Sequence, residues 1–257
     1  MTYQHIKFSL DDRVARITFA RPPVNIFNIA MMQEIDQALN ECGRHRELAA
    51  IVFDAAADCR AFSAGVAVEE HVEDTIFQML DSFHAIFLNL EQINRPTIAV
   101  VEGAALGGGC ELVAACDIVL ASERARFGQP EIKLGVFPPV AAILLPRVIG
   151  EKRARELMLT GELIEAAEAE RLGLVSYVVP DNELAQKTSD LLSKFRNLSA
   201  AALEMTKEAI AMGQGRPLRA ALKEVENLYL NELMKTQDAT EGINAFIDKR
   251  RPEWRHR

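Results

Sequence analysis

The chain has 257 residues, of which 49% are hydrophobic, and this length and composition are ample for one large domain with a buried core. The same composition excludes disordered and fibrous proteins. The net charge of −8 argues against a nucleic-acid-binding protein, which would show a basic stripe. A single phosphate pocket built from a few local Lys or Arg side chains remains compatible with this charge.

The start of the chain and its hydropathy pattern predict a cytoplasmic protein. The opening segment MTYQHIKFSLDDR carries charges and lacks the apolar stretch of a signal peptide. No run of about 18 apolar residues occurs, so neither a transmembrane helix nor a membrane partner is expected.

The cysteines and histidines predict neither disulfides nor a metal site. No CxxC pair occurs, and free thiols are expected in a reducing cytoplasm. The five histidines show no ligand spacing to one another or to a cysteine. His71 and His84 are expected on helix surfaces or pocket rims. The four cysteines are Cys42, Cys59, Cys110 and Cys116.

The first half of the chain alternates predicted strands and helices. Period-two alternation predicts two strands joined by a turn over residues 6–20, and helical spacing predicts a helix over 29–43. The nearly continuous apolar runs 48–55 and 97–103 are typical of strands covered on both faces. A long amphipathic helix is predicted between them, over residues 75–93.

The second half continues the alternation and then becomes helical. Strands are predicted over 116–122, 125–129 and 174–180, and helices over 150–161 and 164–173. Beyond residue 181 strand signals vanish, and apolar stripes predict three helices. These helices cover residues 198–213, 217–236 and 239–251. Strands alternating with helices indicate an α/β core.

The stretch ALGGGCELVAAC, residues 105–116, places three consecutive glycines directly before Glu111. Glycine loses the most conformational entropy on folding, so this run indicates a sharp bend or a close approach of the backbone to another group. Neither GxGxxG nor GK[ST] is present, which excludes a dinucleotide fingerprint and a P-loop. A glycine run between a strand and a helix favours an oxyanion hole, where amides face a developing negative charge. Close helix–strand packing is the alternative.

Two further segments strengthen this hypothesis. RAFSAGVAV, residues 60–68, again places small residues and a glycine after a buried strand, so two turns can offer two amides to one oxygen. FGQPEIKLGVFPP, residues 127–139, contributes a second carboxylate, Glu131. Paired carboxyl groups suit general acid–base catalysis when their environments separate their pKa values. For Glu111 or Glu131 singly, a solvated surface position is the alternative.

The segments FSAGV, ALGGGCELVAACD and FGQPEIKLG, in this order and spacing, resemble the signature segments of the crotonase (enoyl-CoA hydratase) superfamily. The resemblance extends over residues 6–251. It implies an α/β spiral of ββα units in residues 1–195, with the CoA and acyl site, and a helical oligomerisation region in residues 196–257. It also implies an acyl-CoA thioester substrate, no separate cofactor, and a homotrimer or a dimer of trimers.

The same resemblance implies roles for individual residues. The oxyanion amides are those of Val66 and Gly108, and the acid–base carboxyl groups are those of Glu111 and Glu131. Family members that lack one or both glutamates catalyse other reactions. The presence of both here favours addition of water to a C=C bond conjugated with the thioester.

The chain departs from the family pattern in two places. After FSAG the family often has Ala-Asp, whereas this chain has Val66-Ala67; a valine amide donates as well as an alanine amide. After Glu131 a glycine-rich stretch is replaced by FPPVAAILLPRVIG, residues 137–150. Drift at the start of a packed helix is one explanation of this second change.

The other explanation is a reshaped acyl pocket lined by Pro139, Val140 and Ile143. The segment resembles the dienoyl-CoA hydratases of anaerobic benzoyl-CoA degradation, which convert cyclohexa-1,5-diene-1-carbonyl-CoA to 6-hydroxycyclohex-1-ene-1-carbonyl-CoA. An alicyclic ring is bulky and apolar, and it matches such a lining.

Other contacts with CoA are expected at Ala64 and Val68 beside the oxyanion turn, and at Phe246 and Lys249, which would reach a neighbour's CoA. The main alternative function is a straight-chain trans-2-enoyl-CoA hydratase of β-oxidation, and an isomerase or hydrolase could use the same oxyanion hole. A non-catalytic acyl-CoA-binding or RNA-binding member is the alternative from another class. The paired glutamates argue against the first of these and the acidic charge against the second.

Overall fold

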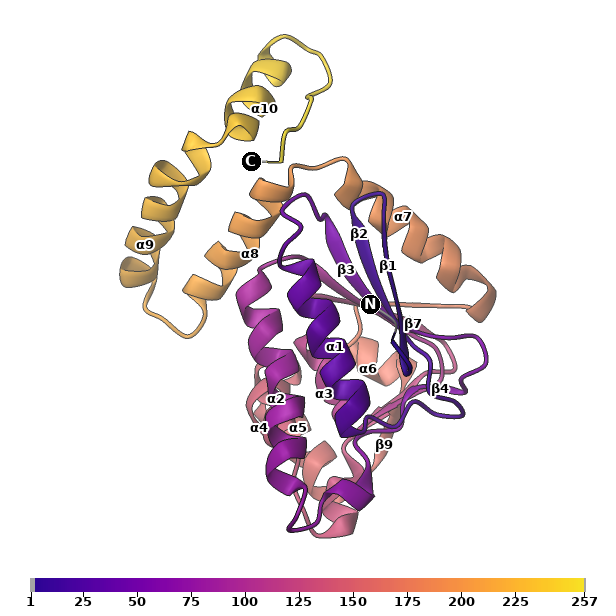
Figure 1. Cartoon of the computed structure of the whole chain (residues 1–257). Coiled ribbons are helices and arrows are strands. Elements are labelled where there is room, and N and C mark those ends of the chain that lie inside the picture. The colour runs from indigo at the N-terminus through magenta and orange to yellow at the C-terminus, as the bar shows by residue number, and fades with distance from the viewer. Residues whose placement is uncertain (1–2, 257) are drawn as a thin grey trace.

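The computed structural model describes residues 3–256 and contains a large and a small β-sheet surrounded by helices (Figure 1). The large sheet has the order β1-β2-β3-β5-β7-β10, and its neighbours are parallel except for β1 and β2. The small sheet has the order β4-β6-β8-β9, with β9 antiparallel to β8. The strands are β1 (Ile6–Asp11), β2 (Val14–Phe19), β3 (Ala50–Ala55), β4 (Ala61–Ser63), β5 (Thr97–Val101), β6 (Ala104–Leu106), β7 (Ile118–Ser122), β8 (Arg126–Gly128), β9 (Leu163–Glu165) and β10 (Tyr177–Val179).

Helices follow the strands and also form the carboxyl-terminal region. None of the described helices is long and apolar enough to cross a membrane. The helices are α1 (Ile29–Cys42), α2 (Ile76–Ile93), α3 (Gly108–Ala115), α4 (Pro139–Ile149), α5 (Glu151–Thr160), α6 (Ala166–Leu172), α7 (Leu184–Arg196), α8 (Ala200–Gly213), α9 (Leu218–Asn231) and α10 (Gln237–Ile247), with short 3₁₀ turns at Val68–Glu70, Pro130–Leu134, Asp181–Glu183 and Leu233–Lys235.

The path of the chain repeats one unit: a strand of the large sheet, a short strand of the small sheet, then a helix. The repeats are β3–β4–α2, β5–β6–α3 and β7–β8–α4. This confirms the predicted spiral of ββα units. Because β4 and β6 pair in parallel, the turns that follow them lie side by side. This pairing brings the segments around Val66 and Gly108 together.

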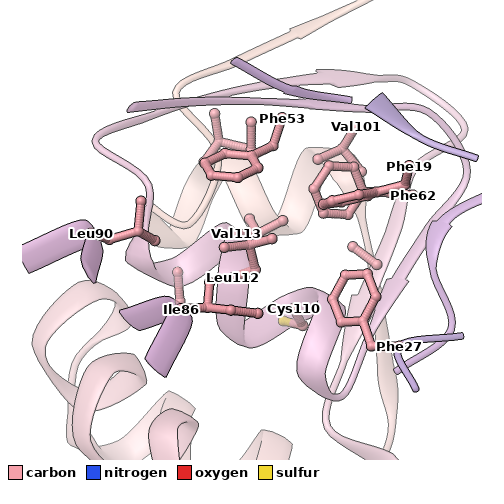
Figure 2. Packing of buried hydrophobic residues seen from close by; sticks show 14 of the residues in the cluster. Phe19, Phe27, Phe53, Phe62, Ile86, Leu90, Val101, Cys110, Leu112 and Val113 are labelled. Carbon is pink, nitrogen blue, oxygen red and sulfur yellow. The ribbon is translucent and has the colours of Figure 1, made fainter. Parts of the chain in front are cut away.

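The main core lies between the large sheet and helices α1, α2 and α3. Four phenylalanines, together with Ile86 and Leu90 of α2, surround Leu112 and Val113 of α3 (Figure 2). These phenylalanines are Phe19, Phe27, Phe53 and Phe62. As a result α3 is buried along almost its whole length, and the side chain of Glu111 is enclosed with it.

The opposite face of the large sheet is covered by α7, whose Leu184 and Leu192 pack on Val52 and Ile98. The apolar runs of β3 and β5 are therefore covered on both faces, as predicted. Beyond α7 the chain forms α8, α9 and α10, and Figure 1 shows α9 and α10 extending away from the sheets. Helix α7 and the three-residue strands β4, β6 and β9 were not predicted from the sequence.

Candidate active site

The three consecutive glycines lie at the amino terminus of α3, and each one contacts a different part of the site. Gly107 precedes the helix at φ +50°, and a Cβ at this position would overlap the carboxylate of Glu131. A Cβ at Gly108 would lie 2.8 Å from Val66 Cγ2, and one at Gly109 would lie 2.7 Å from Ser63 Cβ. The three glycines thus allow Glu131, Val66 and Ser63 to approach the backbone closely.

Val66 sits opposite Phe27 in an isolated parallel bridge. The Phe27 N–H donates to the Gly65 carbonyl (2.8 Å), and the Ala67 N–H donates to the Phe27 carbonyl (2.9 Å). Phe27 therefore binds the residues on both sides of Val66, and the Val66 N–H points the other way. In the described part of the chain, neither the Val66 nor the Gly108 amide donates to a backbone carbonyl. Two adjacent turns thus present two amides that are available to a ligand.

Glu111 lies in the first turn of α3 with only 2% of its surface exposed. Its Oε1 accepts a hydrogen bond from the Ala141 N–H at 2.7 Å, and the Val140 N–H lies close enough to lower the pKa of the carboxyl group. Burial raises the pKa of Glu111 to about 8, and the charge of Glu131 adds to the increase, while the two amide donors lower it. This carboxyl group therefore holds a proton far more readily than one in water.

Glu131 lies in the 3₁₀ turn after β8, and its carboxylate faces Gly107. Its Oε2 is buried and has no hydrogen-bond partner among the described residues. Burial raises the pKa of Glu131 as well. Two carboxyl groups with raised pKa values therefore lie near each other, beside the two available amides.

Helix α4 begins Pro138-Pro139, and its first residue supplies no N–H because it is a proline. The first amides that the helix offers are those of Val140 and Ala141; the Ala141 N–H donates to Glu111, and the Val140 N–H lies near the same carboxylate. Pro139 and Val140 are half-buried, whereas Ile143 is 57% exposed. The structure therefore places Val140 beside the carboxylate of Glu111 and leaves the side chain of Ile143, on the same helix, largely exposed.

The remaining predicted CoA contacts fall into two groups. Ala64 is half-buried beside the Val66 turn, and Val68, at the start of the next 3₁₀ turn, is 54% exposed. Phe246 lies on α10 with 85% of its surface exposed, and Lys249 follows the helix. Figure 1 shows α10 at the opposite end of the molecule from α4, so Phe246 and Lys249 are remote from Glu111 of the same chain.

Three residues around the site were not identified from the sequence. Ser63 and Asn25 are fully buried behind the Val66 turn and are hydrogen-bonded to each other. Phe83 of α2 lies about as close to Gly108 as Val66 does, with its ring carbon Cζ 3.0 Å from the position of a Cβ. Only the small residues of FSAG hinted at such packing, because contacts across the fold leave no local signal.

The chain matches the enoyl-CoA hydratase/isomerase family over residues 10–257. It is 40% identical to a "probable enoyl-CoA hydratase" of Mycobacterium tuberculosis, with 100% of both chains covered. It is 38% identical to a cyclohexa-1,5-dienecarbonyl-CoA hydratase of Thauera aromatica, with 96% of this chain and 95% of the relative covered. The crystal structure of an enoyl-CoA hydratase from Bacillus anthracis superposes with a TM-score of 0.92 at 31% identity, covering 99% of this chain and 100% of the other.

These similarities confirm the resemblance, the fold and the enzyme class, a hydro-lyase, that were expected from the signature segments. The similarity spans both the spiral core and the helical region that follows it. The chain belongs to the enoyl-CoA hydratase/isomerase family.

Proposed function

We propose that the chain adds water to a conjugated C=C bond of a CoA thioester, and that its substrate is cyclohexa-1,5-diene-1-carbonyl-CoA. The observation that carries the hydratase assignment is the pair of buried carboxyl groups, Glu111 and Glu131, beside the available amides of Val66 and Gly108. The CoA belongs to the substrate, and the reaction requires no separate cofactor.

The two amides bind the thioester carbonyl oxygen. When hydroxide adds to the β carbon, electron density moves through the C=C bond onto this oxygen, and an enolate forms. Amide donors fixed in advance by the surrounding backbone stabilise that charge without reorganisation. Val66 is fixed by its bridge to Phe27, and Gly108 by its position at the start of the buried helix α3.

The two glutamates share the proton transfers. Glu111 acts as the general base that takes a proton from water, and Glu131 as the general acid that gives a proton to carbon. The reactive form has Glu111 ionised and Glu131 protonated; the hydrogen bond from the Ala141 N–H lowers the pKa of Glu111 and so favours this form, while burial opposes it. We assign the transferred proton to the Oε2 of Glu131, which is buried and has no partner among the described residues.

With the cyclic substrate the same groups give net 1,4-addition. Water attacks the β carbon of the 1,5-dienoyl thioester, and the charge spreads over a dienolate that includes the second C=C bond. Glu131 then protonates the γ carbon, and the product is 6-hydroxycyclohex-1-ene-1-carbonyl-CoA. The ring must be held in one orientation, since a small misplacement costs about 10²-fold in rate.

The start of α4 favours the cyclic substrate. Prolines and aliphatic residues replace the usual glycine-rich stretch here, and the Thauera aromatica relative is named for this substrate. A straight-chain enoyl-CoA is the second candidate, because the relatives from Mycobacterium tuberculosis and Bacillus anthracis carry the general name. Product analysis after separate incubation with crotonyl-CoA and cyclohexadienoyl-CoA distinguishes the two. Efficient hydration of crotonyl-CoA alone would leave only the general hydratase.

The catalytic assignment has its own test. Glu111→Gln and Glu131→Gln should each lower kcat by about 10²–10⁴-fold while the substrate still binds, because a positioned acid or base contributes that much. Near wild-type turnover in either variant would show that the two-carboxyl mechanism is wrong.

We further propose a homotrimer or a dimer of trimers. Many apolar side chains on α9 and α10 are exposed in the single chain. This exposed apolar surface is larger than expected for helices that face only solvent. The exposed side chains include Leu218, Leu222, Tyr229, Leu230, Ile243, Phe246 and Ile247. In such an assembly Phe246 and Lys249 would reach the CoA of a neighbour rather than that of their own chain.

A further inference from the structure

Ser63 is the last residue of β4 and lies between the two turns that carry the available amides. Its side chain is fully buried, at 0% exposure. The hydroxyl donates to the Asn25 carbonyl at 2.8 Å and accepts from the Gly65 N–H at 3.1 Å. Both hydrogen-bonding capacities of the hydroxyl are therefore used within the backbone of the site.

The hydrogen bond from Gly65 shapes the turn that presents Val66. A serine hydroxyl that accepts the N–H two residues later substitutes for a backbone turn. Gly65 has φ +104°, which only glycine adopts without strain, and its carbonyl accepts from Phe27. The hydroxyl of Ser63 thus fixes the N–H of Gly65, Phe27 fixes its carbonyl, and the next amide in the chain is that of Val66.

The opposite side of Ser63 contacts the second turn. A Cβ at Gly109 would lie 2.7 Å from Ser63 Cβ and 2.9 Å from the Ser63 carbonyl oxygen. Gly109 follows Gly108 directly in α3, so the Ser63 side chain touches the helix one residue beyond the second amide. One buried side chain therefore contacts both turns.

Asn25 supports Ser63 from behind. It is fully buried at φ +51°, its Nδ2 donates to the Ala61 carbonyl at 2.9 Å, and its Oδ1 accepts from the Arg21 N–H at 2.8 Å. The carbonyl that binds Ser63 consequently belongs to a residue that is itself fixed on both sides. Ser63 has little freedom to move.

We propose that Ser63 is the positioning residue that sets the separation between the Val66 and Gly108 amides, an inference that rests on their proposed oxyanion role. Ser63 does not touch the substrate. It keeps the two donors at the spacing at which both reach one carbonyl oxygen.

The test compares binding of butyryl-CoA with binding of its thioether analogue, in which CH₂ replaces the carbonyl, by calorimetry on the full chain. Ser63→Ala should weaken binding of the thioester about fivefold, the size of one net hydrogen bond, and leave the thioether unchanged. It should also lower kcat/KM for enoyl-CoA hydration by about the same factor. A purely structural role would weaken both ligands equally, and that result would overturn the proposal.

Ser122→Ala is the matched control. Ser122 is also fully buried at the end of a strand, and its hydroxyl also accepts the N–H two residues later, from Arg124 at 3.3 Å. The Ser122→Ala variant should leave the ratio of the dissociation constants of the thioester and the thioether unchanged. If Ser63→Ala does not fold, Ser63→Cys keeps the volume with a weaker acceptor and should shift the ratio in the same direction. A wild-type ratio in Ser63→Cys would overturn the proposal.

The binding ratio also separates this proposal from the proposed function. The wild-type protein could bind the thioester more tightly than the thioether and yet hydrate no enoyl thioester. That result would contradict the hydratase function, and the Ser63→Ala binding ratio would still test the role of Ser63. A wild-type protein that binds both equally would contradict the oxyanion role and, with it, the inference about Ser63.

Discussion

The carboxylate of Glu131 occupies the space that a side chain at Gly107 would fill. Gly107 is held in place by its N–H, which donates to the Gly128 carbonyl at 2.9 Å, and by its carbonyl, which accepts from the Glu111 N–H at 2.9 Å. The first glycine of the run therefore contacts both Glu111 and Glu131: its backbone carbonyl binds the N–H of Glu111, and the absence of a side chain leaves room for the carboxylate of Glu131.

Gly107→Ala should displace the Glu131 carboxylate and lower kcat by about 10²-fold, the effect of a misplacement of about 1 Å. Gly150→Ala is the control, because Gly150 also has a positive φ, +78°, but nothing lies within 4 Å of its Cβ position. The Gly150→Ala variant imposes comparable backbone strain and should leave kcat nearly unchanged. Equal losses in both variants would show that strain, rather than contact with Glu131, is responsible.

The pH dependence of kcat/KM should be bell-shaped and displaced upward. One proton on the pair gives one acid and one base, so activity requires the singly protonated pair. Burial raises the pKa of Glu111 to about 8 and raises the pKa of Glu131 above its usual range. Activity should fall above about pH 8, because the pair of carboxyl groups then loses its remaining proton and no acid is left. Full activity well above this pH in a steady-state profile would contradict the paired assignment.

Glu111→Gln should stabilise the protein at high pH. Between the ordinary pKa of a glutamate and about 8, the folded state keeps a proton on Glu111 that the unfolded state has released, so stability falls as pH rises. Glutamine has no proton to lose and can still accept from Ala141. We expect the variant to gain about 2–4 °C in thermal midpoint over wild type at pH 8.5, and less at pH 5.

Glu73→Gln, at an exposed position, is the control for this measurement and should show no such difference. A Glu111→Gln protein that is less stable than wild type at both pH values would mean that the ionised carboxylate is net stabilising.

Ile143→Ala should reduce turnover of cyclohexadienoyl-CoA more than turnover of crotonyl-CoA. Ile143 lies on α4 two residues beyond Ala141, and its truncation would loosen a wall that acts through shape alone. Because both substrates are measured on one protein, a folding defect would lower both rates together. An equal loss with the two substrates would remove Ile143 from the acyl pocket and assign its exposed surface to another contact.

The mass in solution should be that of three or six chains. Burial of the exposed apolar side chains of α9 and α10 between copies would supply the association free energy. Light scattering at micromolar concentration measures this mass directly. A species near 28.5 kDa, the mass of one chain, would contradict the assembly and the reach of Phe246 to a neighbour.

Long periodic elements were predictable because their pattern is local. The strands β3 and β5 are apolar on both sides, since α1, α2 and α3 cover one face of the sheet and α7 the other. The short strands β4 and β6 have three residues each and carry no period, so the second sheet could not be inferred from pattern. The glycine run indicated close approach, although not by which groups.

The hydrogen-bond partners of the individual site residues were harder to predict from the sequence. The N–H that binds Glu111 comes from Ala141, 30 positions away, and the carbonyl that binds Ser63 comes from Asn25, 38 positions away. Such partners are chosen by the fold, and residue type alone does not identify them. The glycine run and the segment after it singled out Glu111 and Glu131 as a pair of carboxyl groups, whereas Val66 and Gly108 were assigned through resemblance to a family.

The Ala141 N–H of helix α4 donates to Glu111, and the side chains of α4 form the proposed acyl wall. A change in α4 therefore affects both the proposed substrate range and the pKa of Glu111. A redesign that reshapes α4 for a larger acyl group also moves the N–H that donates to Glu111, and the pKa of Glu111 changes with it. Libraries that vary residues 139–144 should be screened at several pH values, because a variant that accepts a new substrate can be most active at a different pH from the wild type.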